Sequence, residues 1–192
     1  TNRQSQPIRW VIAENATLKF LDSKGKLVHT VSPYGDKFPG TFTFALGDID
    51  GDTELEVMTV PTSRGSVRVR AFHLNGRPAN VDFIFNKKNG SNGSIAVVSA
   101  NSSAPATIAL GGRSQERPIV SIVDLRGKLI RQWGAFEGSF LGGVNIAVGD
   151  VDGNGTQRIV AGRGAGGRPE VRIFTPEGKL TGLFNAFEAS SH

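Results

Sequence analysis

The sequence predicts an all-β fold, and within that class a β-propeller of about four blades, each a four-stranded antiparallel sheet. Three observations lead to this prediction: a repeat of 51 residues, short runs of alternating apolar and polar residues, and glycine- or proline-containing turns between the runs. Four short strands in each tandem unit are typical of propeller blades. A sandwich or a β-solenoid is the runner-up architecture, but a sandwich has no reason to keep a strict period, and solenoid coils are shorter.

The repeat is carried by several independent columns of residues. A glycine followed by Lys or Arg recurs with the 51-residue spacing: Gly25, Gly76, Gly127 and Gly178. An aromatic column keeps the same spacing: Tyr34, Phe85, Phe136 and Phe187. We expect this aromatic column to pack between blades rather than to form a shelf for stacking sugars. The chain is therefore predicted to be a single domain over residues 1–192, with a partial unit at about 8–40 and full units at about 41–91, 92–142 and 143–192.

Within a unit the pattern predicts four strands, and the last unit shows them most clearly. Residues 143–148 alternate apolar and small side chains, 158–161 are apolar, 170–174 alternate again, and 180–187 form the fourth strand. In the first unit, Trp10-Val11-Ile12-Ala13 aligns with Arg158-Ile159-Val160-Ala161, and the loop that follows is about five residues shorter. No stretch carries a 3.6-residue apolar period over more than two turns, so no long helix is expected.

Composition narrows the range of functions. Hydrophobic residues make up 38% and charged residues 20% of the chain, as in globular proteins. No apolar run approaches the roughly 18 residues of a membrane helix, so no membrane span is expected. Cysteine is absent, which excludes disulfides, thiolate catalysis and cysteine metal sites. The three histidines, His29, His73 and His192, are too few and too scattered to favour a histidine zinc site.

The net charge of +5 raises the question of an anionic partner. One repeat position is basic in three units, with a serine in the remaining one, and two more arginines lie nearby: Lys19, Arg70, Ser121 and Arg172, with Arg64 and Arg68. Such a column could form a basic ring for anionic glycan or nucleic acid, but a solvated strand face is the favoured interpretation. Aromatic residues do not alternate with the basic ones as in single-strand binders, so nucleic acid is not an expected partner.

The clearest chemical motif is an acidic loop between the first two strands of the second unit. Its candidate oxygen ligands stand at alternate positions: Asp48, Asp50, Asp52, the main-chain carbonyl of Glu54, and Glu56. Gly51 allows the backbone to turn at the fourth position. Carboxylates at positions 1, 3 and 5 of a tight loop converge on one point, which suits a hard cation that takes six to eight oxygens at about 2.3–2.6 Å. The spacing therefore predicts a Ca²⁺ site.

A second acidic loop lies two periods later in the chain. Its candidate ligands are Asp150, Asp152, Asn154 and the carbonyl of Thr156. This loop is weaker, because Asn154 replaces the third carboxylate and Arg158 brings a positive charge to the position of Glu56. The corresponding residues of the middle unit carry no carboxylate, so no ion is expected there: Ser99, Asn101 and Ser103. For both acidic loops the alternative is a simple turn in which aspartate side chains bond to their own backbone.

Residues 149–155, followed by 159–162 and 164–174, closely resemble FG-GAP repeats. These are the repeats of integrin α-subunit-like propellers, and they also occur beside VCBS-type repeats in bacterial secreted proteins. The resemblance covers about residues 10–187 and is strongest over 143–187. It implies a calcium-bearing propeller, usually extracellular or on the cell surface, whose ion lies in the hairpin loop between the first two strands of a blade and has a structural role. The carboxylate-free middle loop and Arg158 depart from the family pattern.

The expected function is a non-catalytic, calcium-stabilised binding or adhesion module, extracellular or on the cell surface, with a protein or glycan as ligand. No nucleophile and base pair near the acidic loops, so an enzyme is not expected. The alternatives left open are a carbohydrate-binding lectin, a polysaccharide-active enzyme with a site in the central channel, and a purely structural repeat. The first residues lack the apolar segment of a signal peptide, which is either absent or already removed.

The sequence leaves the closure of the ring open. The first unit lacks its opening strand, and residues 1–7 are too polar to replace an apolar inner strand. Three outcomes follow: a four-bladed ring with an atypical junction, a homo-oligomer formed through an open blade edge, and a piece of a longer propeller. An open blade edge exposes unpaired backbone groups, so it should be paired or covered.

Overall fold

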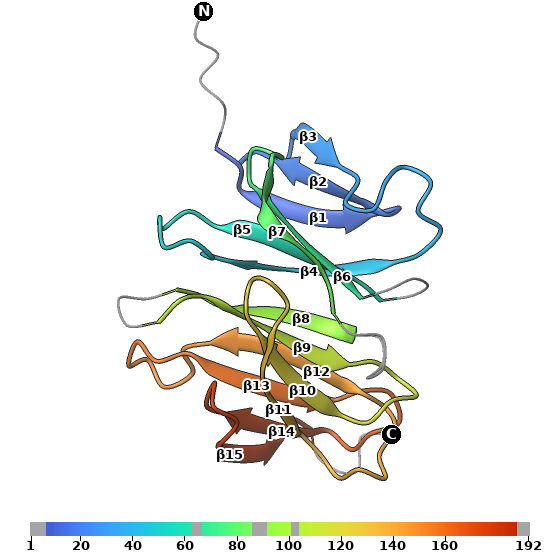
Figure 1. Cartoon of the computed structure of the whole chain (residues 1–192), viewed down its shortest axis with the longest axis vertical. Helices are drawn as coiled ribbons and strands as arrows, with labels where there is room; N and C mark the ends of the chain where they lie inside the picture. The colour runs from blue at the N-terminus through green and yellow to red at the C-terminus, as the bar shows by residue number, and fades with distance from the viewer. Residues whose placement is uncertain (1–6, 63–66, 86–91, 101–103, 188–192) are drawn as a thin grey trace, which may run out of the picture.

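The structure, a computed structural model, describes residues 7–62, 67–85, 92–100 and 104–187. Within these residues fifteen strands form four antiparallel sheets, one of three strands and three of four (Figure 1). This arrangement confirms the predicted all-β class and the predicted repeat of small sheets. The described part of the chain contains no helix long and apolar enough to cross a membrane.

The strands follow one another within each sheet, so every sheet is an up-and-down meander. Sheet 1 contains β1 (Trp10–Glu14), β2 (Thr17–Leu21) and β3 (Leu27–Val31). Sheet 2 contains β4 (Phe42–Gly47), β5 (Glu56–Pro61), β6 (Arg68–His73) and β7 (Pro78–Ile84). Sheet 3 contains β8 (Asn92–Val98), β9 (Thr107–Gly112), β10 (Ile119–Val123) and β11 (Leu129–Gly134). Sheet 4 contains β12 (Val144–Gly149), β13 (Arg158–Arg163), β14 (Glu170–Phe174) and β15 (Leu180–Asn185).

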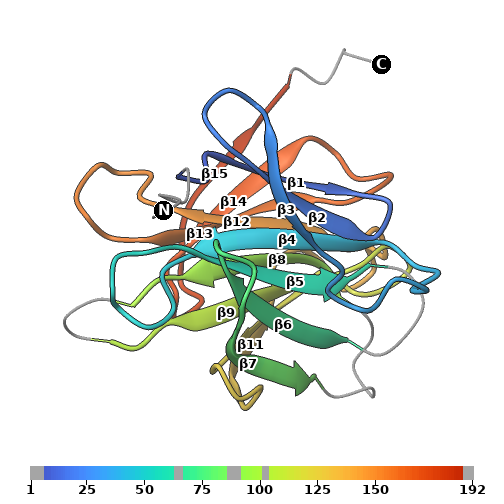
Figure 2. The same cartoon turned by 90° about the horizontal axis from the view of Figure 1, so that it is seen from above.

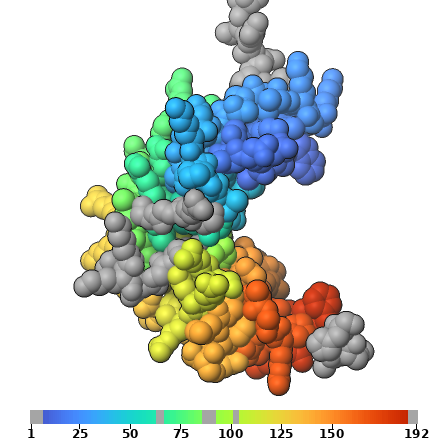
Figure 3. All heavy atoms as spheres, turned by 90° about the vertical axis from the view of Figure 1, so that its right-hand side faces the viewer, coloured from blue at the N-terminus to red at the C-terminus, as the bar shows by residue number. Residues whose placement is uncertain are grey.

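The four sheets pack face to face in chain order. Strand β4 contacts β8, and β8 contacts β12, so the first strands of sheets 2, 3 and 4 lie side by side, as the view from above shows (Figure 2). Strand β1 contacts β4 more slightly. In the described part of the chain, no contact of this extent joins sheet 4 back to sheet 1. The described part of the chain is therefore an arc that is open on one side, with sheet 1 and sheet 4 at its two ends (Figure 3).

The core consists of three apolar clusters, one for each boundary between consecutive sheets. Alternate residues of a strand point to opposite faces, so each inner sheet supplies two clusters. Leu18 and Phe20 of sheet 1 pack with Val57 and Phe72 of sheet 2. The second cluster joins sheets 2 and 3 and the third joins sheets 3 and 4. Because these contacts repeat in every unit, they explain why the apolar columns keep the 51-residue spacing.

The aromatic column behaves as predicted except at its last member. Phe85 and Phe136 are buried between sheets, and the ring of Tyr34 lies edge-on to Phe42 of β4, with 5.9 Å between ring centroids. Phe187 is 69% exposed. The difference has a simple cause: Phe187 follows sheet 4, and in the described part of the chain no further sheet packs over it.

The alignment of the first unit was wrong by one residue. Trp10 pairs with Leu21 and Val11 with Phe20, whereas Ile159 pairs with Phe174 and Val160 with Ile173. Since Leu21 and Phe20 stand 153 residues, three periods, before Phe174 and Ile173, Trp10 corresponds to Ile159 and not to Arg158. A shift of one residue moves every side chain to the other face of a strand. Val11 thus faces sheet 2, and Trp10 and Ile12 face outward at the end of the arc.

Candidate metal centre

The first acidic loop, residues 48–55, connects β4 with β5 as a hairpin, as predicted. Asp48 organises this loop through both of its carboxylate oxygens. Its Oδ1 accepts a hydrogen bond of 2.7 Å from the Gly51 backbone, and its Oδ2 accepts one of 3.0 Å from the Thr53 backbone. Gly51 and Thr53 both have positive φ, of 85° and 72°. The strained conformation at Thr53 is therefore held by a bond to Asp48.

Glu56, the first residue of β5, is fully buried. Its Oε2 accepts a hydrogen bond of 3.1 Å from the Ile49 backbone, and its Oε1 lies 3.1 Å from Nδ1 of His73 on β6. A buried carboxylate is costly unless it is paired or coordinates a metal. The neighbours of Glu56 supply part of that compensation, and a cation bound at the adjoining acidic loop would add to it.

Asp48, Asp50 and Glu56 come together into one cluster, in which one carboxylate oxygen from each lies within 4.8 Å of the others. Two oxygens bound to one Ca²⁺ at about 2.3–2.6 Å are separated by at most about 5.2 Å, so this spacing fits a shared Ca²⁺ ion. The donors are all hard oxygen ligands, which suit Ca²⁺ or Mg²⁺ better than a transition metal. The residues at this place therefore fit the predicted ion.

The remaining two predicted ligands of this loop lie outside that three-residue cluster. Asp52 is exposed, and its Oδ1 accepts a hydrogen bond of 2.8 Å from the Glu54 backbone. A carboxylate has about four acceptor positions, so this bond leaves Asp52 free to bind a cation through its other lone pairs. The ligand roles of Asp52 and of the Glu54 carbonyl stay predictions.

The second acidic loop connects β12 with β13, and its first aspartate likewise accepts two hydrogen bonds from the backbone of its own loop. Asp150 Oδ1 accepts a hydrogen bond of 3.1 Å from the Asn154 backbone, and Oδ2 accepts one of 2.7 Å from Gly155. These backbone bonds, that of Gly155 above all, lower the pKa of Asp150. Asn154 Oδ1 in turn accepts from the Thr156 backbone at 2.9 Å. The ligand roles of Asp150, Asp152, Asn154 and Thr156 stay predictions.

The two loops differ at their ninth position. Where Glu56 places a buried carboxylate, Arg158 forms a salt bridge of 3.0 Å with Asp152. This salt bridge neutralises one of the two carboxylates of the second loop and places a permanent cation beside it. In the middle unit Ser99 is described, whereas Asn101 and Ser103 lie outside the described residues.

The self-bonded turn that the sequence left as an alternative is present in both loops, because Asp48 and Asp150 each bind two backbone N–H groups of their own loop. This pattern does not distinguish the loops. What distinguishes them is the third carboxylate, Glu56, which reaches the first loop from the adjoining strand. His73 contacts that carboxylate; the signal for this contact is the register pair Glu56–His73 across β5 and β6.

The basic column is paired within the chain. Lys19 forms an ion pair with Glu14, Arg70 lies 3.3 Å from Asp82, and Arg172 lies 2.6 Å from Glu170. The basic members of the column therefore form local ion pairs on strand faces, and Ser121 is buried. That the column binds no anionic partner stays a prediction. Of the neighbouring arginines, Arg64 lies outside the described residues, and Arg68 also binds Asp82.

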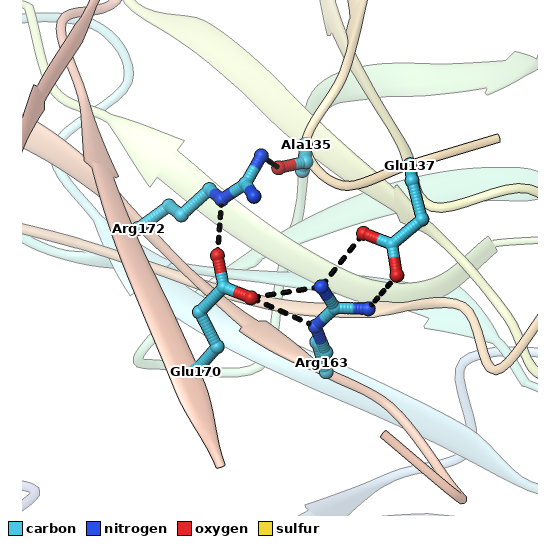
Figure 4. A network of polar contacts seen from close by, with 5 residues as sticks. All are labelled: Ala135, Glu137, Arg163, Glu170 and Arg172. Atoms are coloured by element: carbon cyan, nitrogen blue, oxygen red, sulfur yellow. Dashed lines mark hydrogen bonds and ion pairs between the residues drawn. The ribbon is translucent and has the colours of Figure 1, made fainter. Parts of the chain in front are cut away.

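Arg172 belongs to a larger network around Arg163, which is shown in Figure 4. The Arg163 guanidinium binds Glu170 at 2.8 Å and Glu137 at 2.6 Å, and its centre lies 4.7 Å from the centroid of the Phe136 ring. The hydrogen bond from Arg163 lowers the pKa of Glu137 to about 2. The network ties the connection between β11 and β12 to strands β13 and β14, so its role is structural.

A cavity of about 580 Å³ opens between sheets 3 and 4 beside the second acidic loop. Its walls include Ile122, Ile130, Arg131, Thr156, Arg158 and Glu177. The pKa of Glu177 is lowered, chiefly by a side-chain hydrogen bond with Thr175 and also by the charges of Arg131 and Arg158. The cavity thus combines apolar walls with charges of both signs, as sites for small polar ligands do.

Neither a comparison with protein-family models nor one with curated protein sequences finds a match to this chain. The fold and the candidate site therefore rest on the repeat, the acidic loops and the geometry described above.

Proposed function

We propose that the chain is a calcium-stabilised β-propeller of the FG-GAP type that serves as a non-catalytic binding or adhesion module outside the cell. The observation that carries this proposal is the convergence of Asp48, Asp50 and Glu56 at the β4–β5 hairpin of a repeated four-stranded sheet. When bound there, Ca²⁺ would neutralise three carboxylates that repel one another and would fix the loop against strand β5.

An extracellular location agrees with this kind of site. Only three carboxylates converge at the loop, and one of them, Asp50, is exposed to solvent. Sites with few charged ligands bind Ca²⁺ weakly, and extracellular modules work with Kd values of roughly 10⁻⁴–10⁻³ M. We expect the first loop to bind Ca²⁺ in that range, and the second loop to bind it more weakly because of Arg158.

The ligand of the module is expected at the cavity between sheets 3 and 4. This cavity lies among loops, which carry recognition on a rigid scaffold. Arg131, Arg158 and Glu177 provide charges for hydrogen bonds to a polar ligand such as a glycan or a peptide segment, and Ile122 and Ile130 provide apolar contact.

Thermal unfolding in Ca²⁺ and in chelator tests the calcium part of the proposal. At a free Ca²⁺ concentration 100 times the Kd, binding stabilises the folded state by about 2.7 kcal/mol. For a chain of this size that gain raises the melting temperature by roughly 5–11 °C. Equal melting curves in Ca²⁺ and in chelator would contradict a structural ion at Asp48, Asp50 and Glu56.

A glycan array and a panel of immobilised extracellular-matrix proteins test the binding part. We expect saturable binding on one of the two, and we expect Arg131→Ala to weaken it without changing the melting temperature. A matched control is Arg126→Ala, since Arg126 is also exposed, lies on the connection that leads into β11, and does not line the cavity. Absence of binding on both surfaces would contradict a binding module.

A further inference from the structure

Every boundary between consecutive sheets contains the same close contact. The hairpin between the last two strands of one sheet lies against a large side chain on the last strand of the sheet before it. A Cβ atom built on Gly76 would lie 2.9 Å from the His29 ring and 3.3 Å from Val31. One on Gly127 would overlap the Phe83 ring, and one on Gly178 would lie 2.9 Å from the Trp133 ring. These glycines allow the two sheets to approach closely.

At each end of the arc, one of the two groups that make this contact is present without the other: a hairpin glycine in sheet 1 and a large side chain in sheet 4. Gly25 is the hairpin glycine of sheet 1, with a φ of 76°, and no atom outside its own chain neighbours lies within 4 Å of a Cβ built on it. Phe184 is the counterpart in sheet 4 of Trp133, because Phe184 pairs with Val171 as Trp133 pairs with Val120. Phe184 is 50% exposed.

The outward face of sheet 1 repeats a face that is buried elsewhere in the molecule. Trp10 holds the position that Val57, Ile108 and Ile159 occupy in the other sheets. Those three counterparts are fully buried, whereas Trp10 is 59% exposed. Ile12, two residues further along the same face, is 44% exposed. Large apolar side chains gathered on one exposed face are typical of interaction surfaces.

The outward face of sheet 4 shows the complementary pattern. Val171 and Ile173 continue the apolar columns of strands β2, β6 and β10, and both are only partly buried. Their counterparts in the other sheets have at most 3% of their surface exposed: Leu18, Phe20, Val69, Ala71, Val120 and Ile122. Both open faces are thus built like the halves of an internal boundary between sheets.

A polar contact between consecutive sheets also repeats along the chain, and its two partners are likewise separated at the ends of the arc. The Arg70 guanidinium donates to the Pro33 carbonyl, and that of Arg172 donates to the Ala135 carbonyl at 3.0 Å. In both cases the acceptor stands 37 residues before the arginine and belongs to the segment after the preceding sheet. Lys19 holds the arginine position on the open face of sheet 1, and Ala186 is the counterpart of Ala135 beyond sheet 4. The donor is thus at one end of the arc and the acceptor position at the other.

We propose that sheet 1 of one copy of this chain packs on sheet 4 of a second copy, with Gly25 against Phe184. The occupant of each open face is therefore the opposite face of another identical chain. This contact joins two different surfaces of the chain. An assembly in which all of these surfaces are covered must therefore be a closed ring, and a ring of two arcs is the smallest of this kind. The contact would bury Trp10 and Ile12 as their counterparts are buried inside each chain.

The test is the molar mass of the full chain in solution, measured by sedimentation equilibrium over a range of concentrations. We expect the wild-type protein to reach twice the 20.4 kDa of one chain. Gly25→Asn adds a side chain at a positive φ that asparagine tolerates, and Phe184→Glu removes the apolar half of the contact. Each of these variants is expected to stay at the mass of one chain.

Two matched controls separate this contact from general damage. Gly35→Asn changes a glycine that also has positive φ, 88°, and open surroundings, but that lies in the connection after β3. Leu183→Glu changes the exposed neighbour of Phe184. Leu183 pairs with Arg172, so it points to the opposite face of β15 from Phe184. Both controls are expected to associate like the wild type, and all four variants are expected to keep its circular dichroism spectrum.

Mixing the two interface variants tests the head-to-tail geometry. A Gly25→Asn chain keeps an intact sheet 4 face, and a Phe184→Glu chain keeps an intact sheet 1 face, so a mixture is expected to form pairs that neither variant forms alone. A dimer that joins identical faces cannot be restored in this way. The proposal is overturned if the wild type stays monomeric up to about 100 μM, far above the Kd of a standard interface, or if neither variant weakens the association.

Discussion

Arg158 and Asp152 form a salt bridge of 3.0 Å in the second acidic loop, at the position where Glu56 reaches the first loop. We predict that Arg158→Glu creates a second Ca²⁺ site, because it releases Asp152 and restores the carboxylate that the first loop has. Isothermal titration calorimetry is expected to give one site with the affinity expected of the first loop in the wild type, and two such sites in the variant.

Arg126→Glu is the matched control for that experiment, since it makes the same change in net charge at an exposed position that belongs to neither acidic loop. A second site that appears equally in both variants would mean that net charge alone, and not the geometry of the loop, draws in the ion.

Removing one charge from the first loop should separate calcium binding from folding. We predict that Glu56→Gln abolishes most of the rise in melting temperature caused by Ca²⁺ but leaves the melting temperature in chelator unchanged or higher. The physical reason is that the three carboxylates repel one another without an ion, and the glutamine still offers an oxygen to the Ile49 backbone. Differential scanning calorimetry in Ca²⁺ and in chelator measures both quantities, and a large loss of stability in chelator would show a purely structural role for Glu56.

Equivalent alanine substitutions compare how much each acidic loop contributes to the melting temperature in Ca²⁺. We predict that Asp50→Ala lowers the melting temperature in Ca²⁺ more than Asp152→Ala does, because Asp50 belongs to the three-carboxylate cluster and Asp152 already binds Arg158. In chelator, the difference between the two variants in melting temperature should disappear or reverse, since Asp152→Ala also removes the salt bridge with Arg158. The same calorimetric measurement checks both statements.

The sequence predicted the strands and the acidic hairpins because both depend on local patterns. Alternating apolar residues fix a strand, and Asp48 and Asp150 bind backbone groups of their own loops. Side chains that meet across strands leave a weaker trace. The contact between His73 and Glu56 spans 17 residues and depends on the register of β5 and β6, which no local pattern of residues encodes.

The errors at the two ends of the repeat also have a physical origin. The alignment of Trp10 with Arg158 matched the apolar residues that follow them, but Trp10 to Ala13 are apolar on both faces of β1, so the sequence gives little indication of a shift by one residue. Phe187 keeps its column in the sequence although, among the described residues, no sheet covers it. How the arc is completed depends on contacts beyond any one unit, which a repeat period does not encode.

The network around Arg163 predicts how stability responds to acid. The hydrogen bond from Arg163 lowers the pKa of Glu137 from 4.5 to about 2, and the pKa of Glu170 is lowered for the same reason. A carboxylate whose pKa is lower in the folded state stabilises the fold above its unfolded pKa and loses this contribution as the pH falls through the folded value. We therefore expect Glu137 to make the urea midpoint fall between pH 4.5 and about 2.

Glu137→Gln should flatten this part of the pH profile, because the glutamine has no charge to lose. The two proteins should differ most at neutral pH and converge near pH 2. Parallel profiles for the wild type and the variant would show that Glu137 and Arg163 do not interact in solution, whatever their distance of 2.6 Å in the structure.

Alanine at two hairpin glycines should reveal the strength of the contact between sheets. Both Gly25 and Gly127 have positive φ, of 76° and 84°, so alanine is strained at either position by about 1 kcal/mol. At Gly127 the new methyl group would also overlap the Phe83 ring, whereas at Gly25 it meets no atom within 4 Å. We expect Gly127→Ala to cost roughly 2–4 kcal/mol in total, the excess being the overpacking of the boundary between sheets. Urea unfolding of both variants in the Phe184→Glu background keeps association out of the measurement, and equal costs would show that the hairpins do not press on the preceding sheet.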